Sequence, residues 1–208
     1  MDTSTHVPAV PGPTGPAAVG RPAGSTPTGN AGQAPSVVAH RTVDSPLGSL
    51  LVAATGRGLV RVAFEIEDHA RVLAQLAGWS IGRPQDAPAR GDAAADRHLD
   101  AATRQLGEYF DRRREAFELV LDLRLPIGFR RRVIEELSRI PYGDTQTYGQ
   151  VATAAGSPRA VRAVGTACAT NPVPVVVPCH RVVRADGAVG GYLGGAAAKR
   201  ALLALEAA

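Results

Sequence analysis

The chain is poor in cysteine and has no long apolar run. Its 208 residues contain two cysteines, Cys168 and Cys179, which excludes a disulfide framework. Neither they nor the five scattered histidines have the spacing of a zinc site. No uncharged apolar run of about 18 residues occurs, so no membrane span is expected. The first residues also lack the basic and apolar pattern of a secretory signal. We therefore expect a soluble, cytoplasmic protein that binds no metal.

Lysine and aromatic residues are also scarce. Lys199 is the single lysine, and aromatic residues make up 4% of the chain. The net charge of +4 therefore comes from arginine, which suits contacts with phosphate. A genome-wide bias towards Arg, Ala and Gly codons would produce the same composition. The charge is compatible with a nucleic-acid partner but does not establish one.

The chain divides into a tail and two domains. Residues 1–36 are rich in Pro, Gly, Ala, Thr and Ser, and they predict a disordered tail. Residues 37–122 predict a small α/β domain, and residues 123–208 predict a helical one. Within the first domain we expect strands at 37–43, 49–54, 58–64 and 117–121, and helices at 68–76 and 96–111.

The second domain contains two short helices in succession. Thr147 and Gln150 have the spacing of a capping box, which places the start of a helix at Tyr148. Ser157 and Pro158 fit the N-cap and first position of the next helix. This pattern indicates a helix-turn-helix, although many helical hairpins of this kind bind nothing.

A Cys-His pair lies inside an apolar, proline-rich segment at 171–183. A thiol has an unperturbed pKa near 8.5, so it becomes a good nucleophile when a base takes its proton. His180, next to Cys179, could act as that base if a carboxylate held its other nitrogen. A buried structural cysteine beside a chance histidine is the alternative, and the Pro-Cys-His-Arg-Val context argues against it.

With these motifs, the sequence resembles the O6-alkylguanine-DNA alkyltransferase family from about Thr42 to its end. The first domain resembles the family less closely than the second, through the motif Ser45-Pro-Leu-Gly-Ser-Leu-Leu-Val-Ala. The specific motifs are Ile140-Pro-Tyr-Gly-Asp-Thr, Thr147-Tyr-Gly-Gln-Val-Ala, Arg162-Ala-Val-Gly, Asn171-Pro-Val-Pro, Pro178-Cys-His-Arg-Val-Val, Gly187-Ala-Val-Gly-Gly-Tyr and Leu202-Leu-Ala-Leu-Glu.

The resemblance implies a role for five residues at the reaction centre. Cys179 would accept the alkyl group, and His180 would act as its base through a water molecule. Glu206 would hold His180, and Asn171 would brace the turn around the site. Tyr148 would press on the phosphate beside the flipped base and help to protonate the leaving guanine.

The resemblance also implies how DNA is held. Arg162 would enter the base stack in place of the flipped nucleotide, with Arg159 on the same helix. The small residues Ala160 and Ala163 would let this helix approach the minor groove closely. The main chain of Val182 and Leu193 and the ring of Tyr192 would line the base pocket.

The implied fold is α+β, with a ribonuclease-H-like first domain and a helical second domain that carries the helix-turn-helix. The implied reaction is single-turnover repair of O6-alkylguanine, and of O4-alkylthymine, in double-stranded DNA by a monomer without a cofactor. Two positions depart from the family. Ile134 stands where a large aromatic is common, and Leu193 where several relatives have a small polar residue.

Two other function classes are alternatives to this one. A lesion-binding module that does no repair would lack the acceptor cysteine, so Cys179 argues against it. A cysteine hydrolase would need an oxyanion site that the sequence does not indicate. Simpler interpretations exist for single residues: Arg162 could be solvated, Tyr148 could be packing, Glu206 could be exposed, and Asn171 could only form a turn. Cys168 is expected in the core.

Overall fold

The computed structural model describes residues 38–79, 92–123 and 128–207. The tail predicted at 1–36 lies outside the described residues. In the part of the chain that is described, no helix combines the length and apolarity that crossing a membrane requires.

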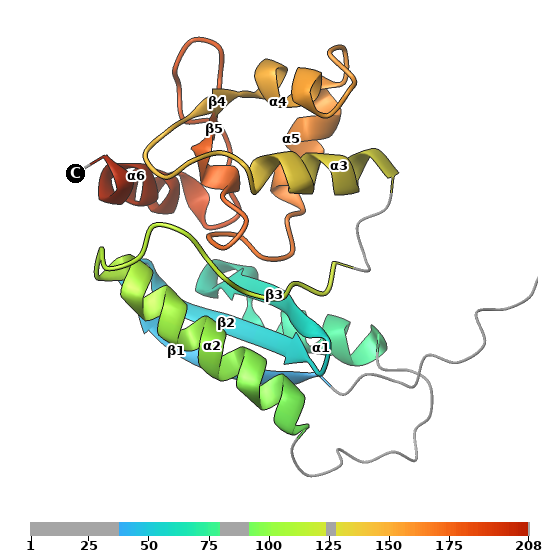
Figure 1. The fold of residues 1–208 in the computed structure, drawn as a ribbon, viewed down its shortest axis with the longest axis vertical. Coiled ribbons are helices and arrows are strands. Elements are labelled where there is room, and N and C mark those ends of the chain that lie inside the picture. The colour runs from blue at the N-terminus through green and yellow to red at the C-terminus, as the bar shows by residue number, and fades with distance from the viewer. Residues whose placement is uncertain (1–37, 80–91, 124–127, 208) are drawn as a thin grey trace, which may run out of the picture. The chain divides into compact units, whose positions relative to one another are not determined.

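The first half is built on a three-stranded antiparallel sheet (Figure 1). Strands β1 (Ala39–Ser45), β2 (Gly48–Thr55) and β3 (Gly58–Phe64) pair in the order β1-β2-β3. This confirms the first three predicted strands, which form an antiparallel meander. Gly48, in the first hairpin turn, has a φ of 94°, a conformation that glycine adopts without steric cost.

The central strand is buried on both faces because each face is covered by a helix. Helix α2 (Ala93–Phe110) packs Leu99 and Leu106 against the face that carries Leu50. Helix α1 (His69–Trp79) packs on the other face, in a cluster that contains Leu51, Ala53, Val72 and Leu76. The alternation of β2 side chains between two apolar clusters fixes its register.

The strand predicted at 117–121 is wrong. This segment makes a single isolated bridge, between Leu121 and Leu59. The reason is a competing partner, since the Gln105 side chain accepts a hydrogen bond from the Glu118 amide at 2.8 Å and donates one to the Glu118 carbonyl at 3.0 Å. A helix side chain therefore satisfies backbone groups that a strand would have used.

The second half consists of short helices around the segment that leads to Cys179. Its elements are α3 (Gly128–Leu137), β4 (Gln146–Thr147), α4 (Tyr148–Ala154), α5 (Val161–Ala169), the 3-10 helix η2 (Cys179–Arg181), β5 (Val182–Val183) and α6 (Gly195–Glu206). The other 3-10 helix, η1 (Glu65–Glu67), follows β3 in the first half. Strands β4 and β5 pair in parallel.

The helix-turn-helix pattern is confirmed at its first helix and corrected at its second. The Gln150 amide donates to Thr147 Oγ1 at 3.2 Å, and the Thr147 amide donates to Gln150 Oε1 at 2.7 Å, which completes the predicted capping box. Ser157 is not the cap of α5. Its carbonyl accepts from the Ala160 amide at 2.9 Å, so residues 157–160 form a turn and the helix begins at Val161.

Backbone contacts hold the segment before Cys179 against the sheet. The Val62 amide in β3 donates to the Pro172 carbonyl at 2.9 Å. Arg61 donates to the Asn171 carbonyl at 3.4 Å. A single apolar core contains residues of both halves, including Phe64 and Cys179. The sheet therefore helps to position the turn that carries the thiol.

Candidate active site

The turn before Cys179 is held by the side chain of Asn171, which is completely buried. Asn171 Nδ2 donates to the Val177 carbonyl at 2.9 Å and reaches Cys179 Sγ at 3.1 Å. Asn171 Oδ1 accepts from the Val173 amide at 3.1 Å. Within this turn Val175 has a φ of 72°, a conformation that is strained for a β-branched residue. One amide therefore both stabilises a strained turn and orients the thiol.

The Cys179 thiol lies at the start of η2 and is 2% exposed. Burial raises the pKa of Cys179 to about 11, against the opposing effect of the hydrogen bond from Asn171. Cys168 is buried on α5, as predicted, and burial raises its pKa to about 12. Both thiols therefore keep their protons at neutral pH, and a reaction at Cys179 requires a base.

His180 forms the predicted pair with a carboxylate. Its Nε2 lies 2.9 Å from Glu206 Oε1, and the imidazole is completely buried. Burial lowers the pKa of His180, although the hydrogen bond with Glu206 opposes this effect. The ring is therefore neutral at pH 7, with its proton on Nε2, because Glu206 can only accept. Nδ1 is buried and receives no hydrogen bond from the described part of the chain, so it can take up a proton.

Glu206 also binds two residues that the sequence did not indicate. Arg181 donates to both carboxylate oxygens, from Nε to Oε2 and from Nη2 to Oε1, each at 2.9 Å. The Tyr109 hydroxyl donates to Oε1 at 2.6 Å. Burial raises the pKa of Glu206, but the hydrogen bonds from His180 and Arg181 outweigh it and lower that pKa to about 2.

Sequence reasoning could have found Arg181 but not Tyr109. Arg181 is a charged residue within a strongly apolar segment, and a buried charge requires a partner. Tyr109 lies on α2, 97 residues before Glu206. Its position on the buried face of an amphipathic helix predicts only core packing.

Tyr148 begins α4 and is half-buried, with Lys199 above its ring at 5.9 Å from the centroid. Burial raises the pKa of Tyr148, as do the two nearby thiols, so the phenol keeps its proton. Lys199 is completely buried, and its Nζ donates to the Val182 carbonyl at 2.5 Å. The lysine thus fixes a carbonyl that was expected to line the base pocket.

Among the other expected pocket residues, Tyr192 lies near His180. The Tyr192 ring packs edge-on against Phe64 at 5.4 Å and lies 6.3 Å from the His180 ring. Val182 is buried, and Leu193 is half-buried and packed against the same core. The structure therefore brings Tyr192 beside the histidine.

The residues expected to contact DNA share one exposed region of the second helix and the turn before it. Arg159, Arg162 and Ala163 are exposed and Ala160 is half-buried, while Val164 and the rest of the inner face of α5 are buried. Within the described ranges, neither Arg159 nor Arg162 forms an ion pair. A neighbouring hollow of 470 Å³ is lined by Thr147, Tyr148, Gly149, Val161, Arg184, Ala185 and Asp186.

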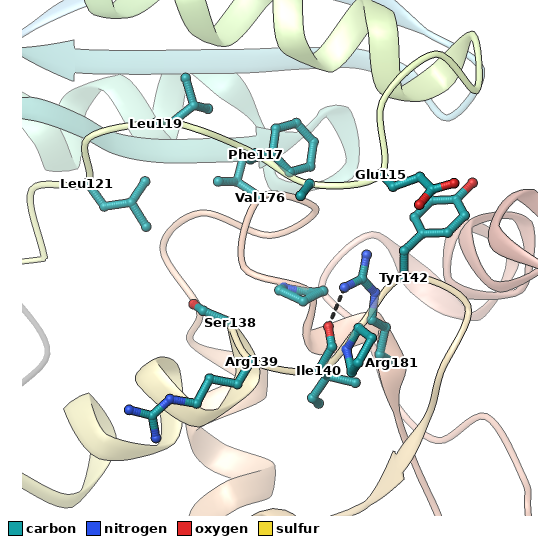
Figure 2. A pocket seen from close by; sticks show the side chains of 13 residues that line it. Glu115, Phe117, Leu119, Leu121, Ser138, Arg139, Ile140, Tyr142, Val176 and Arg181 are labelled. Atoms are coloured by element: carbon teal, nitrogen blue, oxygen red, sulfur yellow. Dashed lines mark hydrogen bonds between the residues drawn. The ribbon is translucent and has the colours of Figure 1, made fainter.

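A second cavity, of 380 Å³, borders Arg181 (Figure 2). In this view the Arg181 guanidinium donates to the Ile140 carbonyl, close to Tyr142. The lining of this cavity includes Phe117 and Leu119, but neither Cys179 nor His180. The cavity therefore does not give access to the thiol.

Two family models match the chain and between them cover most of it. The ribonuclease-like domain of 6-O-methylguanine DNA methyltransferase matches residues 38–123, and the DNA binding domain of the same family matches residues 128–208. The chain belongs to the 6-O-methylguanine DNA methyltransferase family. The resemblance drawn from the sequence motifs is thereby confirmed.

Individual members of the methyltransferase family agree with this assignment. A methylated-DNA–protein-cysteine methyltransferase of Mycolicibacterium paratuberculosis is 41% identical over 170 residues, which cover 82% of this chain and 93% of the relative. The O6-methylguanine methyltransferase of Mycobacterium tuberculosis has a solved structure that is 38% identical, with a TM-score of 0.67, over 82% of this chain and 93% of that one. A structure of the Mycobacterium tuberculosis protein OGT in complex with DNA is 36% identical, with a TM-score of 0.63, over 81% of this chain and 92% of that one. The predicted two-domain α+β fold is confirmed by these structures.

Proposed function

We propose that this methyltransferase repairs O6-alkylguanine in double-stranded DNA by taking the alkyl group onto Cys179. O4-alkylthymine is a second substrate, because it presents the same alkyl–oxygen bond. The observation that carries the proposal is the placement of Cys179, whose Sγ lies 3.1 Å from Asn171 Nδ2 and whose neighbour His180 lies 2.9 Å from Glu206. This is a thiol with a base and an orienting carboxylate.

The first step is proton transfer from Cys179. The thiol proton passes through a water molecule to His180 Nδ1, and Glu206 stabilises the imidazolium that results. Asn171 Nδ2 stabilises the thiolate, since its hydrogen bond lowers the pKa of Cys179. Because burial disfavours the thiolate, it forms only when the substrate is in place.

The second step moves the alkyl group. The thiolate attacks the alkyl carbon, a carbon–sulfur bond forms, and the carbon–oxygen bond breaks with its electron pair left on guanine. The Tyr148 hydroxyl gives the guanine a proton, and the proton taken up by His180 restores Tyr148. The repaired base therefore carries the proton of the Tyr148 hydroxyl, the proton of the thiol ends on Tyr148, and His180 returns to its neutral form.

Access to Cys179 requires the base to leave the helix. At 2% exposure the thiol cannot reach an alkyl group inside stacked DNA. We assign Arg162 to the gap left by the flipped nucleotide and Arg159 to a neighbouring phosphate. Ala160 and Ala163 permit close approach of α5 to the groove. Val182, Tyr192 and Leu193 receive the extrahelical base.

The reaction stops after one turnover. A thioether has no carbonyl that water could attack, so His180 cannot release the product. The protein acts as a monomer in this proposal.

Mass spectrometry of the intact protein tests the proposal. After incubation with excess duplex DNA carrying O6-methylguanine, each chain should gain one methyl group, on the peptide that contains Cys179. Cys179→Ser should gain none and should still bind DNA. Continued turnover, or methylation of Cys168, would contradict the mechanism. Lesion binding without transfer would instead favour a non-enzymatic module, against which the presence of Cys179 argues.

A further inference from the structure

We propose that Tyr109, in the ribonuclease-like domain, is a positioning residue that keeps His180 neutral and able to serve as the base. It does so by competing with His180 for one carboxylate oxygen of Glu206. The effect on His180 can be measured by itself, while its consequence for the reaction rate rests on the function proposed above.

Glu206 Oε1 accepts three hydrogen bonds. The donors are the Tyr109 hydroxyl at 2.6 Å, His180 Nε2 at 2.9 Å and Arg181 Nη2 at 2.9 Å. The bond from Tyr109 is the shortest of the three. Glu206 Oε2 accepts from Arg181 Nε at 2.9 Å and from the Gly143 amide at 3.4 Å. His180 thus shares its carboxylate with two strong competitors.

The position of Tyr109 is fixed. Its side chain is completely buried, and its ring packs against Phe110 at 5.4 Å, Phe117 at 5.3 Å and Tyr142 at 6.2 Å. Burial and the bond to Glu206 raise the pKa of Tyr109 far above its ordinary value. The hydroxyl therefore keeps its proton at neutral pH and can donate it in a hydrogen bond.

Competing donors weaken the attraction between Glu206 and a protonated His180. Each donor draws negative charge from Oε1, and the positive charges of Arg181 and Lys199 lower the pKa of His180 further. The ring of Tyr192, with its centroid 6.3 Å from that of the imidazole, also faces His180. A carboxylate bound to His180 alone would favour a protonated imidazole, and that form could not accept the proton of Cys179.

The matched variants are Tyr109→Phe and Tyr142→Phe. Both remove one phenolic hydroxyl from the same aromatic cluster, but the Tyr142 hydroxyl donates to the Leu205 carbonyl at 3.2 Å and not to Glu206. Folding of each variant is checked by circular dichroism. The pKa of His180 is read from ¹⁵N NMR of labelled histidine, with the signal assigned by its loss in His180→Gln.

Tyr109→Phe should raise the pKa of His180 by about one unit. The pH at which single-turnover methyl transfer reaches half its maximum on the acid side should rise equally. Tyr142→Phe should move neither value. An unchanged pKa in Tyr109→Phe, or an equal shift in both variants, would overturn the proposal. If the unaltered protein transferred no methyl group, the proposed function would fail while the NMR titration still decided the role of Tyr109.

A second variant acts in the opposite direction and preserves the ring. Incorporation of 3-fluorotyrosine at position 109 makes the phenol more acidic, so its hydrogen bond to Glu206 strengthens. The pKa of His180 should then fall below that of the unaltered protein. A rise, or no change, would contradict the proposed competition, whatever the stability of Tyr109→Phe.

Discussion

Glu206 Oε1 lies 2.9 Å from His180 Nε2, although 26 residues separate them in the chain. Glu206 is the last residue of α6, and two buried residues of that helix, Lys199 and Leu202, fix its position. The His180–Glu206 pair is therefore complete only when α6 has packed. The pairing also places an anion where Arg181 and Tyr109 require an acceptor.

Glu206→Gln should slow single-turnover methyl transfer by roughly 100-fold, because the amide cannot stabilise the imidazolium as a carboxylate does. It should also lower the free energy of unfolding by about 3 kcal/mol, since Arg181 becomes a buried charge without its partner. Rapid-quench kinetics and urea unfolding measure the two effects. Glu135→Gln, at a half-exposed pair with Arg131, should change neither. A normal rate in Glu206→Gln would remove this carboxylate from the mechanism.

The free energy of unfolding should fall at acid pH, in part because Glu206 becomes protonated. Glu206→Gln removes that part of the pH dependence. The pKa of Glu206 is about 2 in the folded protein, below its ordinary value of 4.5, so folding favours the carboxylate. Its contribution is complete above pH 4.5 and is lost as the pH falls towards 2, in total roughly 3 kcal/mol. His180, whose pKa is lowered, adds a separate loss that begins near pH 6.5. The free energy of unfolding, measured with urea between pH 7 and 2, should fall less steeply below pH 4.5 in Glu206→Gln than in the unaltered protein. Parallel curves for the two proteins would contradict the lowered pKa of Glu206.

Asn171→Ala should destabilise the protein by about 3 kcal/mol, because the Val173 amide and the Val177 carbonyl lose their buried partner. Asn171→Asp retains the acceptor for the Val173 amide but places a carboxylate beside Cys179 Sγ. Asn171→Asp should therefore destabilise the protein less than Asn171→Ala does, but it should slow methyl transfer and raise the pKa of Cys179. Iodoacetamide labelling of Cys179 as a function of pH measures that pKa. Equal behaviour of the two variants would show that Asn171 serves only the turn.

Arg162→Ala should reduce repair of duplex DNA far more than reaction with free O6-benzylguanine. The side chain is exposed and matters only when a base must leave the stack, which costs a few kcal/mol. Comparing the two second-order rate constants tests this, with Arg104→Ala on α2 as the control. Equal losses on both substrates would assign Arg162 a different role.

Binding to unmodified DNA should weaken steeply with salt, because arginines displace counterions from phosphates. Arg159→Ala should weaken binding uniformly across sequences and reduce the slope of log affinity against log salt by about 1. Fluorescence anisotropy with labelled duplexes provides the measurement. An unchanged slope would place Arg159 away from the phosphates.

The errors in the predicted elements have a common origin. The segment 117–121 has the alternation of a strand, yet Gln105 of α2 bonds the amide and carbonyl of Glu118. Ser157 and Pro158 have the composition of a helix start, yet a turn delays α5 to Val161. In both cases a local pattern permitted two hydrogen-bonding arrangements, and packing selected between them.

The sequence by itself determined the features that depend on neighbouring residues. The Cys179–His180 pair is adjacent in the chain, the Thr147–Gln150 capping box spans one helical turn, and Asn171 bonds within its own turn. Only the tertiary structure decided which residues share Glu206. Tyr109 and Arg181 meet it across 97 and 25 residues, where no periodicity relates the partners. A hydrogen bond of that kind exists because separate elements pack together, so it leaves no signature in local sequence.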